Sequence, residues 1–141
     1  MSRHARVAVH AAVWFAVFAF WLVVTRGNQP TWAVAVVATL ILVGGSAAAV
    51  YADWYTLRPW FAARRRWLAY TVWLLAVVAA LTFLTVPLIQ AVYDAAGIPK
   101  EIRFGFWQNV GIEAMWYAVH VGAAAGGRAV VNLIQATARG R

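Results

Sequence analysis

The sequence predicts an all-α integral membrane protein, a bundle of four transmembrane helices with both termini in the cytoplasm. Of its 141 residues, 65% are hydrophobic and only 11% are charged, whereas a soluble domain is about half apolar and about a quarter charged. The apolar residues are gathered into four long segments with short polar connections. We therefore expect residues 1–141 to form one membrane domain.

Each of the four segments has a length that suits a bilayer. A hydrocarbon core of about 30 Å needs roughly 20 apolar residues in a helix. The first three segments are uncharged runs of 19, 22 and 27 residues, and the fourth, residues 104–127, contains one charged residue, Glu113. The expected helices cover about residues 7–25, 31–52, 67–93 and 104–135.

The connections favour sequential, antiparallel packing because they are short. Residues 26–30 contain Gly27 and Pro30, which are typical of a tight turn. Residues 53–66 form a longer inner connection, and residues 94–103 an outer loop with an interfacial turn. Pro87 lies within the third segment, where a missing backbone hydrogen bond predicts a kink.

The arginine residues predict the orientation. Nine of the 12 basic residues lie before the first segment, between the second and third, or after the fourth. They are Arg3, Arg6, Arg58, Arg64, Arg65, Arg66, Arg128, Arg139 and Arg141. The positive-inside rule then places both termini in the cytoplasm of a bacterial inner membrane. The net charge of +8 thus indicates orientation and lipid headgroups, with Arg64, Arg65 and Arg66 as an anchor, and no nucleic acid.

Nine tryptophans are present, and most fit an aromatic belt at the membrane boundaries. The expected inner anchors are Trp54, Trp60 and Trp67, and the outer ones Trp21, Trp32 and Trp107. Trp14, Trp73 and Trp116 lie deeper, where they either pack between helices or face a neighbouring protein or pigment.

Ionisable groups inside a span are candidates for function. Glu113 and His120 are seven residues apart, so they share one helical face with Trp116 between them. His10 is the other histidine within a span. His10 and His120 lie about 3 and 8 residues from their inner ends, about 7 Å apart in depth, which argues against one haem between them. Two roles remain for His120. It binds a pigment or haem through a single bond, or it forms hydrogen bonds inside the bundle.

Small residues predict close helix contacts. Ala118, Gly122 and Gly126 recur every fourth position on one face of the last helix. Such a pattern lets two backbones approach closely in a membrane. Contact within the bundle and contact with a partner chain are both open.

No pattern in the sequence predicts catalysis or a metal centre. There is no cysteine, hence no Cys-based zinc, haem or redox site. Neither a nucleophile with its base nor a glycine-rich phosphate loop is recognisable. We therefore expect a non-enzymatic protein without a metal.

Residues 51–61, YADWYTLRPWF, precede the arginine cluster and Tyr70. This stretch resembles the loop between the second and third membrane helices of LytS/AlgZ-type sensor histidine kinases, as do His10 and Trp14 at the start of the first helix. In that family the loop reads roughly Tyr-x-Asn-x-Tyr-x-Leu-x-Pro, and here Asp53 replaces the Asn. The resemblance covers about residues 1–95 and implies a four-helix sensory module. We expect no kinase activity, because the phospho-accepting and ATP-binding regions are absent from these residues.

Two functional hypotheses follow. The first is an accessory or structural subunit that associates laterally with a larger membrane protein complex. The alternative is a sensory module that binds a ligand around Glu113 and His120 and signals to a separate kinase. The expected partners are membrane lipids and other membrane proteins, with a homo-oligomer also possible by lateral contact.

Overall fold

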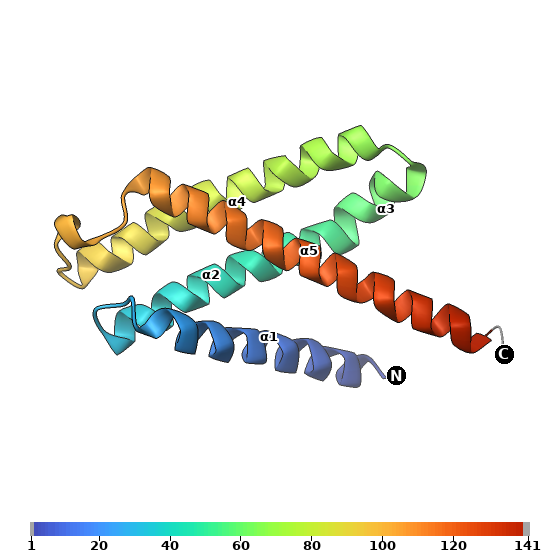
Figure 1. Cartoon of the computed structure of the whole chain (residues 1–141), viewed down its shortest axis with the longest axis horizontal. Coiled ribbons are helices and arrows are strands. Elements are labelled where there is room, and N and C mark those ends of the chain that lie inside the picture. The colour runs from blue at the N-terminus through green and yellow to red at the C-terminus, as the bar shows by residue number, and fades with distance from the viewer. Residues whose placement is uncertain (1, 140–141) are drawn as a thin grey trace.

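The computed structural model describes residues 2–139 (Figure 1). Its long helices are α1 (Arg3–Arg26), α2 (Trp32–Ala52), α4 (Trp67–Ala95) and α5 (Phe106–Arg139). The described residues are 88% helical and include no strand, which confirms the all-α class. Arg141, which contributed to the predicted charge asymmetry, lies outside the described residues.

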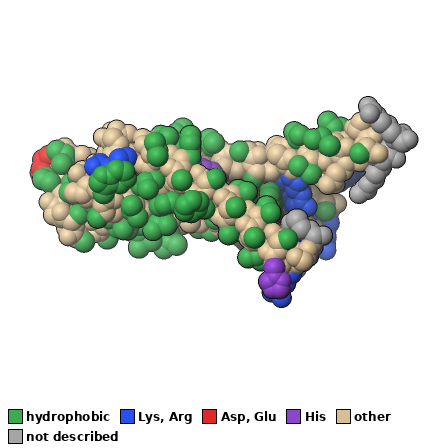
Figure 2. All heavy atoms as spheres, turned by 90° about the horizontal axis from the view of Figure 1, so that it is seen from below, with side chains coloured by type: hydrophobic (Ala, Val, Ile, Leu, Met, Phe, Trp, Pro, Cys, Tyr) green, Lys and Arg blue, Asp and Glu red, His purple; other side chains and the backbone are tan. Residues whose placement is uncertain are grey.

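Three segments are long and apolar enough to cross a membrane, Arg3–Arg26, Trp32–Arg64 and Trp67–Ala95. Within the described part of the chain, α5 is not among them. Its 34 residues are less uniformly apolar, since they include Glu113, His120 and Arg128. Figure 2 shows hydrophobic side chains over the middle of one face and charged side chains toward its ends.

The helices run between the same two ends of the molecule, with α5 crossing α2 at an angle, and their connections alternate between these ends (Figure 1). One end holds the start of α1, the connection between α2 and α4, and the late part of α5; we call it the arginine-rich end. The other end holds the α1–α2 and α4–α5 connections, and we call it the loop end. The central helix is α2, which contacts α1, α4 and α5.

The connection between α2 and α4 is more helical than the sequence predicted. A π-helical turn, η1 (Asp53–Leu57), leads into α3 (Arg58–Trp60) and a 3-10 turn, η2 (Ala62–Arg64). The N–H of Arg58 bonds to the carbonyl of Asp53, five residues back, which is the spacing of a π turn. The helical segment that begins with α2 therefore continues past residue 52 to Arg64. The chain reverses near Arg65, whose φ is 55°.

The α4–α5 connection begins with a Schellman turn. Gly97 has a φ of 67°, its N–H bonds to the carbonyl of Asp94, and the N–H of Ile98 bonds to that of Tyr93. These two bonds satisfy the last carbonyls of α4. The predicted interfacial turn follows as a 3-10 helix, η3 (Lys100–Ile102).

The buried core is built on α2. Its buried residues follow helical spacing and include Ala35, Leu42, Ser46 and Ala49, whereas α1 has no buried residue. Buried Tyr117 of α5 packs against this face at Gly45, where an added Cβ would lie 2.3 Å from the tyrosine hydroxyl oxygen. Glycine is therefore required for α5 to lie this close to α2.

Candidate functional site

His120 lies in a hydrogen-bonded network between α1, α2 and α5. Its Nδ1 is 2.8 Å from the carbonyl of Trp116, and a carbonyl only accepts, so Nδ1 carries the proton. Its Nε2 accepts from the indole N–H of Trp21 at 3.1 Å. Ser46 Oγ approaches Nδ1 at 3.4 Å. Both ring nitrogens are engaged, so a haem or pigment bound through Nε2 would have to displace Trp21.

Trp21 is the residue of this network that sequence reasoning missed. The sequence placed it in the outer aromatic belt, but it is half-buried and its ring lies 3.9 Å from that of Trp116, centroid to centroid. Trp116 is thus a packing partner as well as a neighbour of His120. Along the first helix, Trp21 lies at the depth of a boundary residue. Its contact with His120 and Trp116 depends on the side of α1 that faces α5, which the sequence does not give.

A second hydrogen-bonded chain joins α5 to α4. The hydroxyl of buried Tyr117 donates to Thr85 Oγ1 at 2.8 Å, and Thr85 donates to the carbonyl of Leu81 at 2.9 Å. Thr85 lies two residues before Pro87, through which α4 continues as one helix. Inside a bundle such bonds help hold neighbouring helices in register.

Glu113 lies in a separate hollow toward the loop end. Its side chain is only 6% exposed, and its Oε2 is buried with no hydrogen-bond partner among the described residues. It lines a cavity of about 260 Å³ that we call the Glu113 cavity. The other polar residues of this lining are Thr25, Asn28, Gln29, Thr39, Tyr93 and Asn109. His120 does not line this cavity, so the structure separates the two ionisable candidates.

His10 faces a groove between α1 and α5. The indole N–H of Trp14 donates to the hydroxyl of Tyr51 at 2.8 Å, and that hydroxyl lies 3.0 Å from His10 Nδ1. The groove has a volume of about 570 Å³, and we call it the α1–α5 groove. Its lining is mainly apolar and includes His120, Ala123, Ala124, Gly127, Arg128 and Val131.

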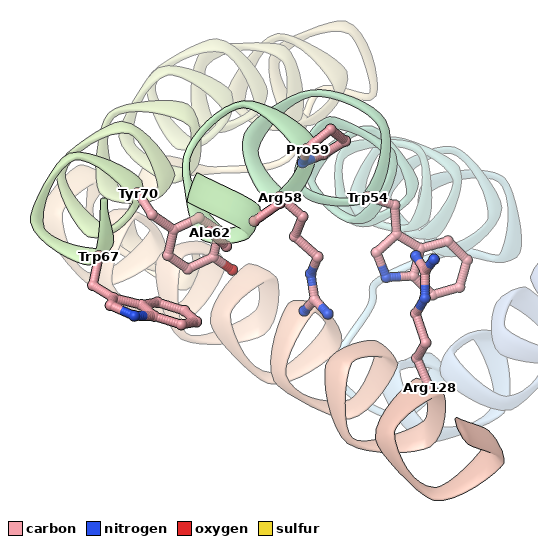
Figure 3. A pocket seen from close by; sticks show the side chains of 8 residues that line it. Trp54, Arg58, Pro59, Ala62, Trp67, Tyr70 and Arg128 are labelled. Atoms are coloured by element: carbon pink, nitrogen blue, oxygen red, sulfur yellow. The ribbon is translucent and has the colours of Figure 1, made fainter. Parts of the chain in front are cut away.

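The arginine-rich end holds a pocket of about 400 Å³ that we call the arginine pocket (Figure 3). Behind it, Asp53 is 1% exposed and accepts from Arg58 Nε at 2.6 Å and from the Tyr70 hydroxyl at 2.7 Å. Arg128 extends from α5 over the ring of Trp54, with 5.6 Å from guanidinium carbon to ring centroid. Asp53 therefore fixes Arg58, and Trp54 supports Arg128.

The predicted interface anchors divide into two kinds. Trp60 and Trp67 are each 61% exposed, and the arginine cluster of residues 64–66 is also exposed. Trp54 is instead half-buried and packs against the core. Its indole nitrogen is buried without a hydrogen-bond partner among the described residues.

The small-residue face of the last helix lies outside the bundle. Ala118, Gly122 and Gly126 are exposed, and a Cβ added at either glycine would meet nothing within 4 Å. The alternative of contact within the bundle is therefore not realised by these residues. We call this exposed set the α5 small face.

Within residues 2–139, no group of three or more His, Asp or Glu side chains is placed to hold a metal ion. The acidic residues are also dispersed. Asp53 pairs with Arg58 and Asp94 with Arg103, while Glu113 lies alone in its cavity.

No family model, curated protein or solved structure matches this chain. The resemblance of residues 1–95 to LytS/AlgZ-type sensors stays a prediction.

Proposed function

We propose that this chain is a non-enzymatic, multi-pass protein of the bacterial inner membrane that acts by lateral association. In this proposal α5 crosses the membrane as the fourth span, and its small face contacts a transmembrane helix of a larger membrane protein. The first 22 residues of α5, up to Gly127, suffice for a span of about 30 Å. Arg128 then lies beside Trp54 at the arginine-rich end, which is the cytoplasmic end under the positive-inside rule.

The observation that carries this proposal is the exposure of glycines that the chain itself does not need. Gly45 is explained by Tyr117, which fills the space of its missing side chain. Gly122 and Gly126 have no such neighbour, although glycine within a helix costs about 1 kcal/mol relative to alanine. In membranes, small residues at this spacing allow another helix to pack backbone to backbone. A partner helix on the α5 small face would explain both glycines.

The proposal is tested by the size and composition of the particle extracted from its native membrane. The wild-type chain should be extracted in mild detergent with one companion protein in fixed stoichiometry, identified by mass spectrometry. Gly122→Leu with Gly126→Leu should release the companion. Leucine favours the helix over glycine, so this loss would not reflect a weaker α5.

The matched control is Ala76→Leu, which enlarges an exposed small residue on α4 and should leave the companion bound. A solitary monomer in the wild type contradicts the proposal. If the companion is a second copy of this chain in fixed stoichiometry, the α5 small face forms a homo-oligomer and does not bind a larger partner. An absorption band in the same preparation would favour a pigment instead.

A second candidate function, a sensory module, rests on the Glu113 cavity. A buried carboxyl group with one oxygen unpartnered among the described residues, in a partly polar cavity, is a suitable acceptor for a ligand with N–H or O–H donors. In this reading the ligand enters from the loop end and the signal passes to a separate kinase. Tyr117 and Trp116, which neighbour Glu113 along α5, would transmit the change to α4 and α1 through Thr85 and Trp21.

The sensory alternative predicts that Glu113→Gln abolishes a ligand response without loss of folding. Glutamine keeps the size of the side chain and removes its negative charge. His120→Ala should have the same effect if the two residues act together, as the sequence suggested. A response that survives Glu113→Gln, in protein of unchanged helicity by circular dichroism, contradicts this alternative.

A further inference from the structure

We propose that the arginine pocket and the α1–α5 groove together bind one anionic phospholipid of the inner leaflet. The phosphate lies between Arg58 and Arg128, and an acyl chain lies in the groove. This inference goes beyond the proposed lateral association and does not depend on it.

The arginine pocket carries an excess of positive charge. Arg58 and Arg128 are the charged side chains that line it in the described part of the chain, and they extend into the same space from α3 and from α5 (Figure 3). Asp53 offsets one of these two charges through its bond to Arg58 Nε. An excess of positive charge remains, next to the exposed arginines at positions 64–66. Basic pockets between helices at the cytoplasmic side are suited to anionic lipid headgroups.

The two arginines of the pocket are held so that part of each guanidinium group stays free to donate hydrogen bonds. Because Asp53 holds Arg58 through Nε, the terminal guanidinium nitrogens of Arg58 stay available to an anion. Arg128 is held over the Trp54 ring, which leaves the edge of its guanidinium group free. Two arginines held in this way can each donate charge-assisted hydrogen bonds to phosphate oxygens. The exposed Trp67 ring on the same pocket is placed to lie at headgroup depth.

The apolar groove beside the pocket favours a lipid over a soluble phosphate. Trp54 and Arg128 line both the arginine pocket and the α1–α5 groove, so the charged site adjoins an apolar one. The groove is larger than the pocket, at about 570 Å³ against about 400 Å³. A charged head joined to an apolar chain is the chemistry that matches both hollows together.

The lipid site and the proposed partner site lie on opposite faces of α5. Ala123, Ala124 and Gly127 line the groove, whereas Gly122 and Gly126 belong to the exposed small face. Substitutions at neighbouring glycines can therefore separate the two proposals. A Cβ added at Gly127, which lines the groove, would meet nothing within 4 Å, so Gly127→Leu is a suitable substitution to obstruct it.

The test is a titration of the purified, delipidated full chain in mild detergent, read by native mass spectrometry. Phosphatidylglycerol should bind about tenfold more tightly than phosphatidylcholine of the same chain length. Soluble glycerol phosphate should bind at least about tenfold more weakly than phosphatidylglycerol, since it lacks the chain. Equal binding of the two lipids would overturn the proposal. Glycerol phosphate binding as tightly as phosphatidylglycerol would indicate a soluble-anion site and would overturn it as well.

The variants locate the site. Arg128→Gln should weaken phosphatidylglycerol binding about tenfold, while Arg66→Gln, a matched loss of charge outside the pocket, should not. Gly127→Leu should also weaken binding and Gly126→Leu should not. Equal effects within either pair, in proteins of unchanged helicity, would contradict the assignment. Loss of the partner protein in Gly126→Leu with lipid binding retained would leave the lipid site established independently of the proposed function.

Discussion

Tyr117 of α5 packs against Gly45 of α2, and a single added methyl group tests this contact. In Gly45→Ala the new Cβ would lie 2.3 Å from the Tyr117 hydroxyl oxygen, which Thr85 holds in place. We expect a loss of about 1 to 3 kcal/mol in unfolding free energy, as for other overpacked sites. An unfolding titration in sodium dodecyl sulfate measures it.

Gly44→Ala is the matched control, because nothing lies within 4 Å of a Cβ at that position. It should be neutral or slightly stabilising. Tyr117→Phe should reduce the effect of Gly45→Ala only in part, since ring carbons also lie within 3 Å of the added atom. Equal stability of the two alanine variants would mean that α5 does not pack on α2 as described.

Asp53 is the second residue whose removal has a defined expected effect. Asp53→Ala would leave Arg58 without its carboxylate and the Tyr70 hydroxyl without its acceptor. Breaking a fully buried pair costs about 3–5 kcal/mol, and we expect about 2 kcal/mol because Arg58 is 27% exposed at its side chain. The same detergent titration measures it.

Asp53→Asn should lose less than Asp53→Ala, because the amide oxygen can still accept from one of the two donors, the Tyr70 hydroxyl or Arg58 Nε. Asparagine is also the residue that the resembling sensor loops carry here. An asparagine variant as unstable as the alanine variant would indicate that the negative charge, rather than the hydrogen bonds, holds the connection together.

Sequence reasoning identified Glu113 and His120 as candidates for function but could not give their partners. Hydropathy and spacing place a residue at a depth and on a helix face. They do not give the rotation of one helix against another, which decides whether Trp21 faces lipid or His120. For the same reason the sequence left both contact within the bundle and contact with a partner open for the α5 small face. Only the packing of α5 against α2, through Tyr117 at Gly45, places this face outside the bundle.

At the scale of the helices, the turn after α4 depends on one glycine. Gly97 has a φ of 67°, a conformation that costs an L-residue about 1–2 kcal/mol. Gly97→Ala should lower the unfolding free energy by about 1 kcal/mol in the detergent titration. Gly27→Ala is the control, because Gly27 has a φ of −64° after α1 and should tolerate alanine. Equal effects would contradict the Schellman turn.

The helices themselves were largely predictable, and their ends were less so. The predicted helix over residues 31–52 is observed as Trp32–Ala52, and that over 67–93 as Trp67–Ala95, because long apolar runs dominate both. The first helix begins earlier than predicted, at Arg3, since Ser2 caps it by accepting from the N–H of Ala5. The π turn after residue 52 has no hydropathy signal, so the helical connection could not be foreseen.

We expect the whole molecule to cross the membrane four times, with both termini on one side. The chain contains no cysteine, so single cysteines can be introduced and labelled with a membrane-impermeant reagent in intact cells. Asn28→Cys and Ala96→Cys, in the two loop-end connections, should react. Ala63→Cys and Thr137→Cys, at the arginine-rich end and late in α5, should react only after the membrane is opened.

This labelling also decides the role of α5. If Thr137→Cys reacts in intact cells as Asn28→Cys does, the late part of α5 is outside and the two termini are not on one side. If Ala63→Cys reacts there as well, the orientation inferred from the arginines is inverted.

The most direct test of the central claim is site-specific photocrosslinking in native membranes. A photoreactive amino acid at Gly122, on the α5 small face, should yield one discrete crosslinked product with a partner protein. The same group at Ala76, on the exposed side of α4, should yield none, and Gly126→Leu should abolish the product from position 122. Identical patterns from positions 122 and 76, or crosslinks to lipid alone from both, would contradict lateral association through α5.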